Sequence, residues 1–403
     1  MGVLHMKSIF SATLLAGILA MVSATQAQLL EHSGHIFHMR VCGGQNAPAG
    51  VARCHAHIVT DSAGHPWHVQ MSQGRVMPNT TPAVQVYYLP AQLRAAYGIT
   101  GLGSPHTIVA IVDAYAYPGA ASDLAIFRAA TGLPPCNNCL KIVNEMGGNQ
   151  PPAQSDPGWD LEQALDLDMV STMCPNCRIL LVEANSPNFG DLARAENAAA
   201  FLGAHSIGNS YGGSEIGSVP YSFAYDHPGV AITASAGDYG YGVVFPASSP
   251  SVIAVGGTSL IWTGSSRTET AWSGSGSGCS TVYSEPIWQS FRLPGTANNT
   301  LCTKRMMNDV SAVADLNTGV IVYMGGNFYV FGGTSVAAQI INGIYGEKGD
   351  SVLYGSGLYL GYRSLFDVTS GSDGSCGGTY FCTAIPGYDG PTGLGTPNGD
   401  KPF

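Results

Sequence analysis

Short apolar segments alternate with segments of helical character from about Val84 onward, and this alternation constrains the fold more than any other feature of the sequence. The predicted strands are residues 107–112, 178–182, 230–234 and 252–255, and the predicted helices are residues 123–131, 159–170 and 192–202. Strands that are apolar on both faces belong in a sheet that helices cover on both sides. The sequence therefore predicts an α/β fold with a mostly parallel central sheet, in which functional residues gather at the carboxyl ends of the strands.

The composition narrows the classes of function. With 403 residues, of which 45% are hydrophobic, the chain can bury one large core or two smaller ones, and we favour one large domain preceded by a small segment. Its 16 Lys and Arg face 26 Asp and Glu, a formal charge of -10 without a basic patch, so a nucleic acid is not an expected partner. Only 10% of the residues are charged, so few ion pairs would be lost when carboxylates become protonated. This suits a protein that stays folded in acid, although a loop-rich secreted protein would have a similar composition.

Residues 1–27 have the pattern of a secretory signal peptide. Lys7 precedes an apolar run from Ile9 to Met21, and small residues follow up to Ala27. No other stretch has the roughly 18 uninterrupted apolar residues of a membrane span. We therefore expect a secreted, extracellular monomer with no membrane partner once the signal is removed.

Ten cysteines, an even number in an exported chain, predict disulfide bonds. Pairing each cysteine with its neighbour in the sequence gives Cys42–Cys54, Cys136–Cys139, Cys174–Cys177, Cys279–Cys302 and Cys376–Cys382. The alternative is a four-thiolate zinc site made by the two Cys-x-x-Cys pairs. The gap between these pairs is wide for a zinc ribbon, and an oxidising compartment disfavours free thiolates.

Residues 28–84 contain seven of the eleven histidines: His32, His35, His38, His55, His57, His65 and His68. No serine-bearing glycine turn or acidic partner accompanies them, so we interpret this segment as a short propeptide that precedes a functional domain at 85–403. Its histidines would become charged near their ordinary pKa of about 6.5 and loosen the segment in acid. Metal binding by the histidines at 32, 35 and 38, or by residues 54, 55 and 57, is the alternative.

Ser335 is the candidate nucleophile. It follows a Gly-Gly turn at 332–333 and begins an apolar, small-residue run of helical character. Glycine allows backbone angles that other residues avoid, and a serine in the first turn of a helix has an unpaired backbone N–H that can act as an oxyanion donor. A helix cap by Thr334 or Ser335 is the structural alternative.

Acidic residues at two places could assist such a serine. Glu162 and Asp166 are four residues apart on the predicted helix 159–170, so they share one face, and two acids at this spacing tend to titrate as a pair. Asp238 follows the predicted strand 230–234 in a tight turn, where a protonated carboxyl could donate a hydrogen bond to an oxyanion. The alternatives are a solvated acidic helix face and a simple turn-forming aspartate.

Together these residues resemble the sedolisin, or serine-carboxyl peptidase, family, which has a subtilisin-like fold. The resemblance extends from about Tyr87 to the C-terminus and rests on segments in the family's order: Glu162-x-x-Leu165-Asp166, Ser206 to Gly213, Ala236-Gly237-Asp238, Phe245 to Pro250, Ala254 to Thr258 and Gly333-Thr334-Ser335. It implies an acid-acting endopeptidase whose partners are polypeptide substrates and its own propeptide. By resemblance Ser335 is the nucleophile, Glu162 its general base, Asp166 the group that orients Glu162, and Asp238 the oxyanion donor beside the Ser335 N–H.

A carboxylate base suits acidic surroundings. A histidine with a pKa near 6.5 is almost wholly protonated at about pH 4, whereas a carboxylate with a pKa of about 4 can still accept a proton. The same acidity keeps Asp238 protonated. The sequence therefore predicts an acidic optimum, with activity failing toward neutrality as Asp238 ionises.

The resemblance also implies one structural calcium ion near the C-terminus. Its ligands would be the side chains of Asp367 and Asp389 and the carbonyls of Val368, Ile385 and Gly387, a hard oxygen cage that suits calcium. Ile385 stands where the family usually has glycine, which a carbonyl ligand tolerates. Without the resemblance, both aspartates would be interpreted as turn formers.

Three features depart from the family pattern. The segment before the functional domain is far shorter than the usual prodomain, Gly332 replaces a common serine, and Gln339 stands where proline is frequent. We expect neither Gly332 nor Gln339 to touch the reacting groups.

Two other functions compete with this interpretation. A neutral subtilisin-type protease needs an early aspartate, for which Asp113 is available, and a His-Gly motif, but none of His106, His205 and His227 precedes a glycine. The second competing function is an inactive secreted binding module on a peptidase fold. The presence of all three acidic residues of the resemblance, Glu162, Asp166 and Asp238, argues against it.

Overall fold

The largest sheet is built from the apolar segments found in the sequence. The computed structural model describes residues 30–33, 36–44, 47–72, 75–76, 86–290 and 301–403, so the predicted signal peptide and His35 lie outside the described residues. Within these ranges an eight-stranded sheet has the order β10-β11-β9-β12-β14-β15-β16, with β19 paired to β15. Its strands are β9 (Ile108–Ala114), β10 (Leu140–Asn144), β11 (Arg178–Ala184), β12 (Ser206–Asn209), β14 (Ala231–Ser235), β15 (Ile253–Trp262), β16 (Arg267–Ala271) and β19 (Val310–Val313). Every pair is parallel except β15 with β16, so the predicted mostly parallel sheet is confirmed.

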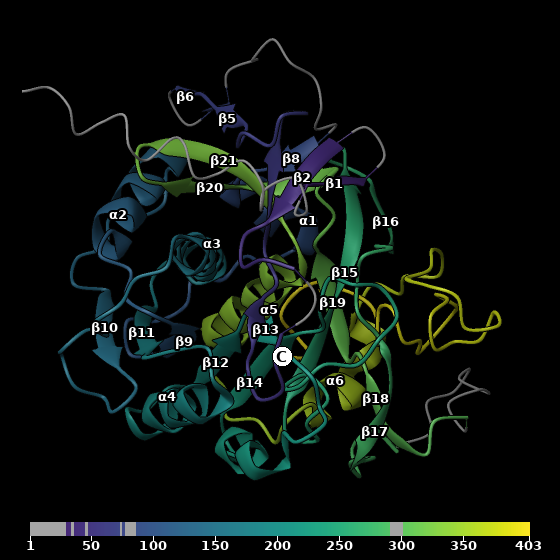
Figure 1. Cartoon of the computed structure of the whole chain (residues 1–403). Coiled ribbons are helices and arrows are strands. Elements are labelled where there is room, and N and C mark those ends of the chain that lie inside the picture. Colours follow the sequence, from purple (N-terminus) through teal and green to yellow (C-terminus); the bar gives the residue numbers. More distant parts are fainter. Residues whose placement is uncertain (1–29, 34–35, 45–46, 73–74, 77–85, 291–300) are drawn as a thin grey trace, which may run out of the picture.

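Helices cover both faces of this sheet, as predicted (Figure 1). Val109 and Ile111 of β9 belong to the hydrophobic cluster that contains α3 and α5, whereas Ala110 and Val112 belong to the cluster of α4. Successive side chains of a strand point to opposite faces, so a strand buried on both sides must be apolar throughout. The helices involved are α2 (Ala120–Thr131), α3 (Pro157–Met173), α4 (Phe189–Phe201) and α5 (Thr334–Lys348).

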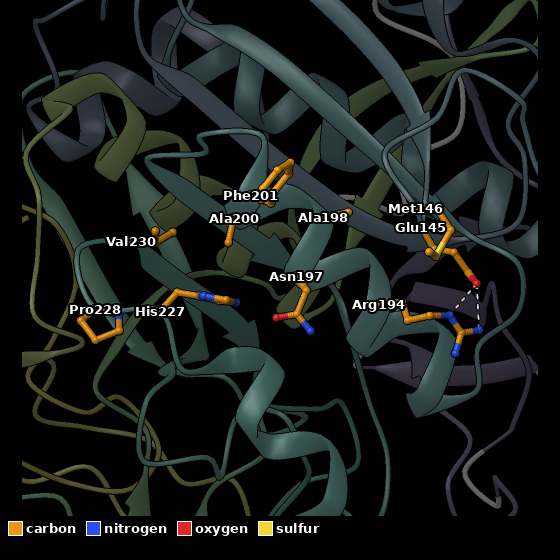
Figure 2. Close-up of a pocket in the computed structure, with 10 residues that line it drawn as sticks. All are labelled: Glu145, Met146, Arg194, Asn197, Ala198, Ala200, Phe201, His227, Pro228 and Val230. Atoms are coloured by element: carbon orange, nitrogen blue, oxygen red, sulfur yellow. Dashed lines mark hydrogen bonds and ion pairs between the residues drawn. The ribbon is translucent and has the colours of Figure 1, made fainter.

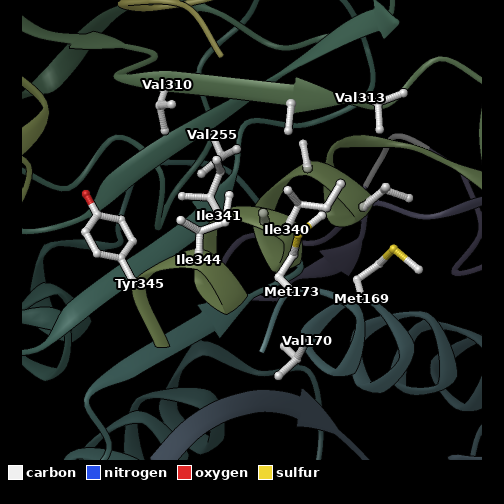
Figure 3. Packing of buried hydrophobic residues seen from close by; sticks show 14 of the residues in the cluster. Met169, Val170, Met173, Val255, Val310, Val313, Ile340, Ile341, Ile344 and Tyr345 are labelled. Carbon is white, nitrogen blue, oxygen red and sulfur yellow. The ribbon is translucent and has the colours of Figure 1, made fainter. Parts of the chain in front are cut away.

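Helix α5 runs through the centre of the core. Its residues Ile340, Ile341 and Ile344 pack among Met173 of α3 and strands β15 and β19 (Figure 3). Gly346 lets the helix lie close to the sheet, because a Cβ there would meet Cγ2 of Val109 at 2.0 Å. The N-terminus of α5 is therefore held in a fixed position, and Ser335 lies in its first turn.

A second sheet lies over α2 and α3 at the top of Figure 1 and includes four strands of the histidine-rich segment. Its order is β1-β2-β4-β21-β20-β8, with β5 paired to β21. The strands are β1 (Leu30–Ser33), β2 (Ile36–Arg40), β4 (His57–Thr60), β5 (His68–Val69), β8 (Val86–Tyr88), β20 (Thr318–Met324) and β21 (Asn327–Gly332). Because β4 pairs with β21, the segment predicted as a propeptide packs directly beside the strand that leads into Ser335.

Short elements complete the described structure. Three pairs of short strands are present: β3 (Arg53–Cys54) with β13 (Tyr211–Gly212), β6 (Met71–Ser72) with β7 (Arg75–Val76), and β17 (Gly278–Ser284) with β18 (Lys304–Met307). The remaining helices are α1 (Pro90–Tyr97) and α6 (Ser356–Gly361), and the 3-10 helices are η2 (Val219–Tyr225) and η4 (Tyr362–Ser364). In the part of the chain that is described, no helix has the length and apolar character needed to cross a membrane.

The disulfide pattern follows proximity in the sequence. All five predicted bonds are present: Cys42–Cys54, Cys136–Cys139, Cys174–Cys177, Cys279–Cys302 and Cys376–Cys382. Since no cysteine of the described chain remains free, a four-thiolate zinc site is excluded.

Candidate active site

Two carboxyls of the predicted site project from one face of α3. The helix begins at Asp156, whose side chain accepts hydrogen bonds from the N–H groups of Gly158 and Trp159 at 3.0 and 3.1 Å. From this start Glu162 and Asp166 fall one turn apart, and both are fully buried. The alternative of a solvated acidic helix face is therefore wrong.

Asp166 is held by two donors. The hydroxyl of Ser210 donates to Oδ1 at 2.8 Å, and Nε2 of Gln339 donates to Oδ2 at 2.6 Å. Gln339 lies one turn beyond Ser335 on α5, so the same helix carries the candidate nucleophile and a donor to the acid pair. The expectation that Gln339 touches no reacting group is wrong, and its spacing of four residues from Ser335 was the signal that could have found it.

A third carboxyl, Asp113 on β9, joins this pair. It is fully buried, and within the described structure neither of its oxygens has a hydrogen-bond partner with good geometry. Burial raises the pKa of Asp113, Glu162 and Asp166, and the charge of Asp113 is the next largest cause for the other two. Three carboxyls this close do not all ionise together, so the group retains protons and titrates as a unit.

Ser335 lies beside Glu162. Gly333 precedes the helix with φ of 106°, in a region that favours glycine, and a Cβ there would meet the carbonyl oxygen of His55 at 2.0 Å. The Ser335 hydroxyl donates to the carbonyl of Ser210 at 3.2 Å and is near enough to Glu162 to lower the pKa of that carboxyl, against the larger effect of burial. Oε1 of Glu162 has no hydrogen-bond partner among the described residues. Proton transfer between serine and glutamate is therefore chemically available.

Asp238 is fixed to the N-terminus of the same helix. Its Oδ1 accepts hydrogen bonds from the backbone N–H and the hydroxyl of Thr334, at 2.8 and 2.7 Å, and its Oδ2 lies 3.2 Å from Nε2 of His57. Burial raises the pKa of Asp238, opposed by His55, Arg40 and Thr334. The structure thus brings all four predicted site residues to the start of α5, and Thr334 is a positioning residue that the sequence did not reveal.

A cavity of about 370 Å³ opens next to Asp238. Its lining includes the glycine pair 212–213, the turn residues Ala236 and Gly237, and the side chains of Tyr241, Val243 and Val244. Strand β3 occupies the backbone edge of β13 in this structure, so another extended chain could lie along that edge only after β3 has left it.

Residues 51–57 cover the site from the histidine-rich segment. Strand β3 pairs antiparallel with β13, and the N–H of His55 donates to the carbonyl of Ser210 at 3.0 Å. The N–H of Ala56 donates to Oε2 of Glu162 at 3.0 Å. Ser335 and Glu162 are 0% exposed, so the described structure is a closed form of the site.

Three buried histidines of the histidine-rich segment have lower pKa values than the sequence predicted. Burial lowers the pKa of His38 to about 3, of His55 to about 4 and of His57 to about 3. For these three residues, the prediction of charging near the ordinary histidine pKa is wrong. Their rings stay neutral in mildly acidic solution because a buried imidazolium ion is poorly solvated.

A larger cavity, of about 720 Å³, lies elsewhere (Figure 2). It lies beside α4 and is lined by residues that include Met146, Phe201 and His227, with an ion pair of 2.8 Å between Arg194 and Glu145. None of the predicted site residues lines it, so the acidic cluster at α3 and α5 remains the candidate site.

The predicted calcium ligands are also brought together. Asp389 is buried and accepts hydrogen bonds from the N–H groups of Ile385 and Thr392, each at 2.9 Å, while Asp367 accepts from the N–H of Gly387 at 3.0 Å. Burial, and then the charge of Asp367, raise the pKa of Asp389. No basic side chain of the described chain pairs with either carboxylate. Two neighbouring carboxylates from separate segments, without a basic partner among the described residues, fit a hard cation.

Known proteins resemble the chain in sequence and in fold, although no family model matches it. Kumamolisin of Bacillus sp. (strain MN-32) is 29% identical over 371 residues, which cover 81% of this chain and 65% of that protein. Sedolisin of Pseudomonas sp. (strain 101) is 36% identical over 177 residues, which cover 39% of this chain and 29% of that protein. The chain spans less than two thirds of the length of these curated relatives.

Solved structures give the same picture for the fold. Pseudomonas sedolisin complexed with two molecules of pseudo-iodotyrostatin superposes with a TM-score of 0.67 at 25% identity, covering 78% of this chain and 96% of that one. An S41 psychrophilic protease superposes with a TM-score of 0.51 at 16% identity, covering 78% and 99%, and that likeness concerns the fold alone.

Proposed function

The chain belongs to the sedolisin family, and on this premise we propose that it is a secreted, acid-acting serine-carboxyl endopeptidase. The observation that carries the proposal is the contact of the Ser335 hydroxyl with a buried glutamate that has one oxygen without a partner. Burial raises the pKa of Glu162 in the closed form, so the proposal requires that the cover leaves and water enters. A solvated carboxylate can then accept the serine proton in acid, whereas an ordinary histidine would already be charged.

The proposed reaction follows from where the groups lie. Glu162 takes the proton of Ser335 as the hydroxyl attacks a peptide carbonyl, and it later gives that proton to the leaving amine. Asp166, fixed by Gln339 and Ser210, orients Glu162. Protonated Asp238 and the Ser335 N–H donate to the oxyanion, and water then hydrolyses the acyl-enzyme with Glu162 again as base.

The neutral subtilisin-type alternative finds no support at the site. Asp113 does lie at the end of a central strand, but the nearby histidines come from the covering segment. Among these, His55 contacts the hydroxyl of Ser235 at 2.7 Å and His57 contacts Asp238. The carboxylate base is therefore favoured over an imidazole base.

Residues 28–84 act, in this proposal, as a short propeptide, and residues 85–403 as the peptidase domain. The cover at 51–57 lies along β13 as an added strand and occupies the general base, which is how an inhibitor would bind. Activity then requires that this segment moves or is cut. The remaining partners in the proposal are polypeptide substrates, and the mature protein is a monomer.

One structural calcium ion completes the proposal. The carboxylates of Asp367 and Asp389 and the carbonyls of Val368, Ile385 and Gly387 would hold it. The support is the pair of carboxylates described above, which lack a basic partner within the described residues. A bound cation would neutralise them and stabilise the C-terminal loops.

Peptide cleavage by the secreted chain at about pH 4 tests the function. The wild type, after incubation in acid, is expected to cleave a peptide library, and Ser335→Ala to cleave nothing. A peptide aldehyde, which forms a reversible adduct with a serine nucleophile, should inhibit the wild type. A chain that binds peptides but never cleaves them would support the binding-module alternative instead.

A further inference from the structure

Three potential metal ligands meet on neighbouring strands of the second sheet. Glu31 on β1, His38 on β2 and His57 on β4 each offer one ligand atom, and these atoms lie within 4.8 Å of one another. Glu31 and His38 are direct partners in the β1–β2 ladder, so their side chains share a face. The cluster therefore results from strand register and not from mobile loops.

The two imidazoles already face each other with their Nδ1 atoms. The Nδ1 atoms of His38 and His57 are 2.9 Å apart, and both rings are buried. In the metal-free chain one ring must donate this hydrogen to the other. A cation beside the two nitrogens could instead accept both lone pairs, with the Glu31 carboxylate as a third ligand.

The far side of His57 has the arrangement found around metal-binding histidines. Its Nε2 lies 3.2 Å from Oδ2 of Asp238, and neither atom has a hydrogen bond of good geometry to another described residue. A histidine that binds a metal through one nitrogen usually donates from the other to a carboxylate, which fixes the tautomer and the ring orientation. Asp238 supplies that acceptor.

Solvent can reach the cluster through a cavity of about 570 Å³. Glu31, His38, His57 and Asp238 all line this cavity, and the side chain of Glu31 is 37% exposed. We propose that Glu31, His38 and His57 form a binding site for a divalent transition-metal ion of the zinc class. In this site Nε2 of His57, which does not bind the metal, would donate a hydrogen bond to Asp238.

The donor set favours zinc over calcium. Zinc binds imidazole nitrogen and carboxylate oxygen and often has three protein ligands with an open fourth position, whereas calcium requires oxygen ligands. A bound ion would join the three strands that flank the cover over Glu162.

Arg40 competes with the metal for Glu31. Its Nε and Nη2 donate to the two Glu31 oxygens at 2.5 and 3.0 Å, and its guanidinium lies 4.0 Å from the ring centre of Tyr239. Metal binding must break this pair and place a second positive charge beside the arginine. Removing Arg40 should therefore strengthen metal binding, a result that a purely structural role for these residues would not give.

Zinc titration of the full chain carrying Ser335→Ala tests the site, because self-cleavage is then absent and no activity is needed. Isothermal titration at about pH 6, with excess calcium to fill oxygen-only sites, should show one zinc bound. His38→Gln, His57→Gln and Glu31→Gln should each weaken binding by about tenfold or more, Arg40→Gln should tighten it, and the exposed control His68→Gln should leave it unchanged. Cobalt(II) should give visible absorption bands that disappear in the two histidine variants.

Two results would overturn the site. One is the absence of zinc uptake by the parent chain. The other is unchanged zinc affinity in a folded His38→Gln/His57→Gln variant, with folding checked by its melting temperature without metal. Glu31→Gln changes a half-exposed side chain outside the core, so its effect on zinc affinity can be judged even if the histidine variants fold poorly.

Discussion

The backbone N–H of Ala56 donates a 3.0 Å hydrogen bond to Oε2 of Glu162. The chain thus places its own main chain on the side chain proposed as general base, and it covers a serine that is 0% exposed. Access to the site therefore depends on how firmly residues 51–57 are held.

The Cys42–Cys54 disulfide is expected to hold residues 51–57 in place, since Cys54 lies in the covering strand β3. A disulfide of this loop length contributes about 2–4 kcal/mol. The Cys42→Ala/Cys54→Ala variant should therefore show a shorter lag before peptidase activity after a shift to acid. Stopped assays of peptide cleavage against time measure the lag.

The matched control is Cys376→Ala/Cys382→Ala, which removes another short disulfide loop outside the cover. It should lower the melting temperature without changing the lag. Equal lags in the wild type and the Cys42→Ala/Cys54→Ala variant would argue against a restraining cover.

Gln339 is expected to lower the pKa of the acid pair, Glu162 and Asp166. Its hydrogen bond to Asp166 lowers the pKa of that carboxyl, although burial raises the pKa more. Gln339→Leu should move the acid limb of the kcat/KM profile to higher pH and reduce kcat by about tenfold, the scale of one hydrogen bond to a charged group.

Gln289→Leu is the control, because Gln289 is also buried but donates to the carbonyl of Met306 at 2.7 Å. It should reduce stability and leave the position of the acid limb unchanged. A Gln339→Leu profile that coincides with the wild-type profile would contradict the positioning role.

Asp238 is expected to act through the hydrogen it can donate. Asp238→Ala should lower kcat/KM by about 100-fold to 1000-fold, the usual cost of one lost oxyanion donor. Asp238→Asn keeps an N–H donor and should retain more activity than the alanine variant. Steady-state kinetics of both variants measure the difference, and an alanine variant within a few-fold of the wild type would count against the oxyanion role.

The buried Glu196 on α4 should make the chain more stable in acid than at neutrality. Burial raises its pKa well above the ordinary value, and neither carboxyl oxygen has a hydrogen-bond partner of good geometry in the described chain. Above an unfolded pKa of about 4.3, the native state holds a proton that the unfolded state has released, so stability falls as pH rises toward the folded pKa. Glu196→Gln should therefore be more stable than its parent at about pH 7, with less difference at about pH 4.

Urea unfolding of the Ser335→Ala chain at both pH values measures how steeply the free energy of unfolding changes with pH, which is the slope tested here. Asp350→Asn, at an exposed position, is the control and should leave the slope unchanged. A Glu196→Gln chain whose stability depends on pH as steeply as the parent would show that this carboxyl is not the source.

Calcium should stabilise the C-terminal loops. Chelation is expected to lower the melting temperature of the chain, and added calcium to restore it, because only the folded state gathers Asp367 and Asp389. Asp389→Asn should respond weakly to either treatment, whereas the control Asp400→Asn should respond like the parent. A parent melting temperature that is independent of calcium would remove the ion from the proposal.

Local patterns predicted the parallel sheet and the acid pair. Strand β9 is apolar on both faces, so its burial could be read directly, and the four-residue spacing of Glu162 and Asp166 placed both on one helical face. The disulfides followed from proximity in the sequence.

Other features depend on contacts between distant segments. Strand β4 pairs with β21, far along the chain, and neither strand carries a pattern that identifies its partner. The contact of Ala56 with Glu162 is made by a backbone N–H, a group that every residue except proline has, so the residue type could not predict it. Burial lowers the pKa of His38 and His57 below the value expected from their residue type, because loss of solvation disfavours the charged ring.

The general-base role of Glu162 is tested most directly by kcat/KM for peptide cleavage at about pH 4, measured for the mature wild type and for Glu162→Gln. We predict that Glu162→Gln loses about 100-fold to 10,000-fold, the range expected when a general base is removed. A Glu162→Gln enzyme that cleaves within a few-fold of the wild type would contradict the role of this carboxylate.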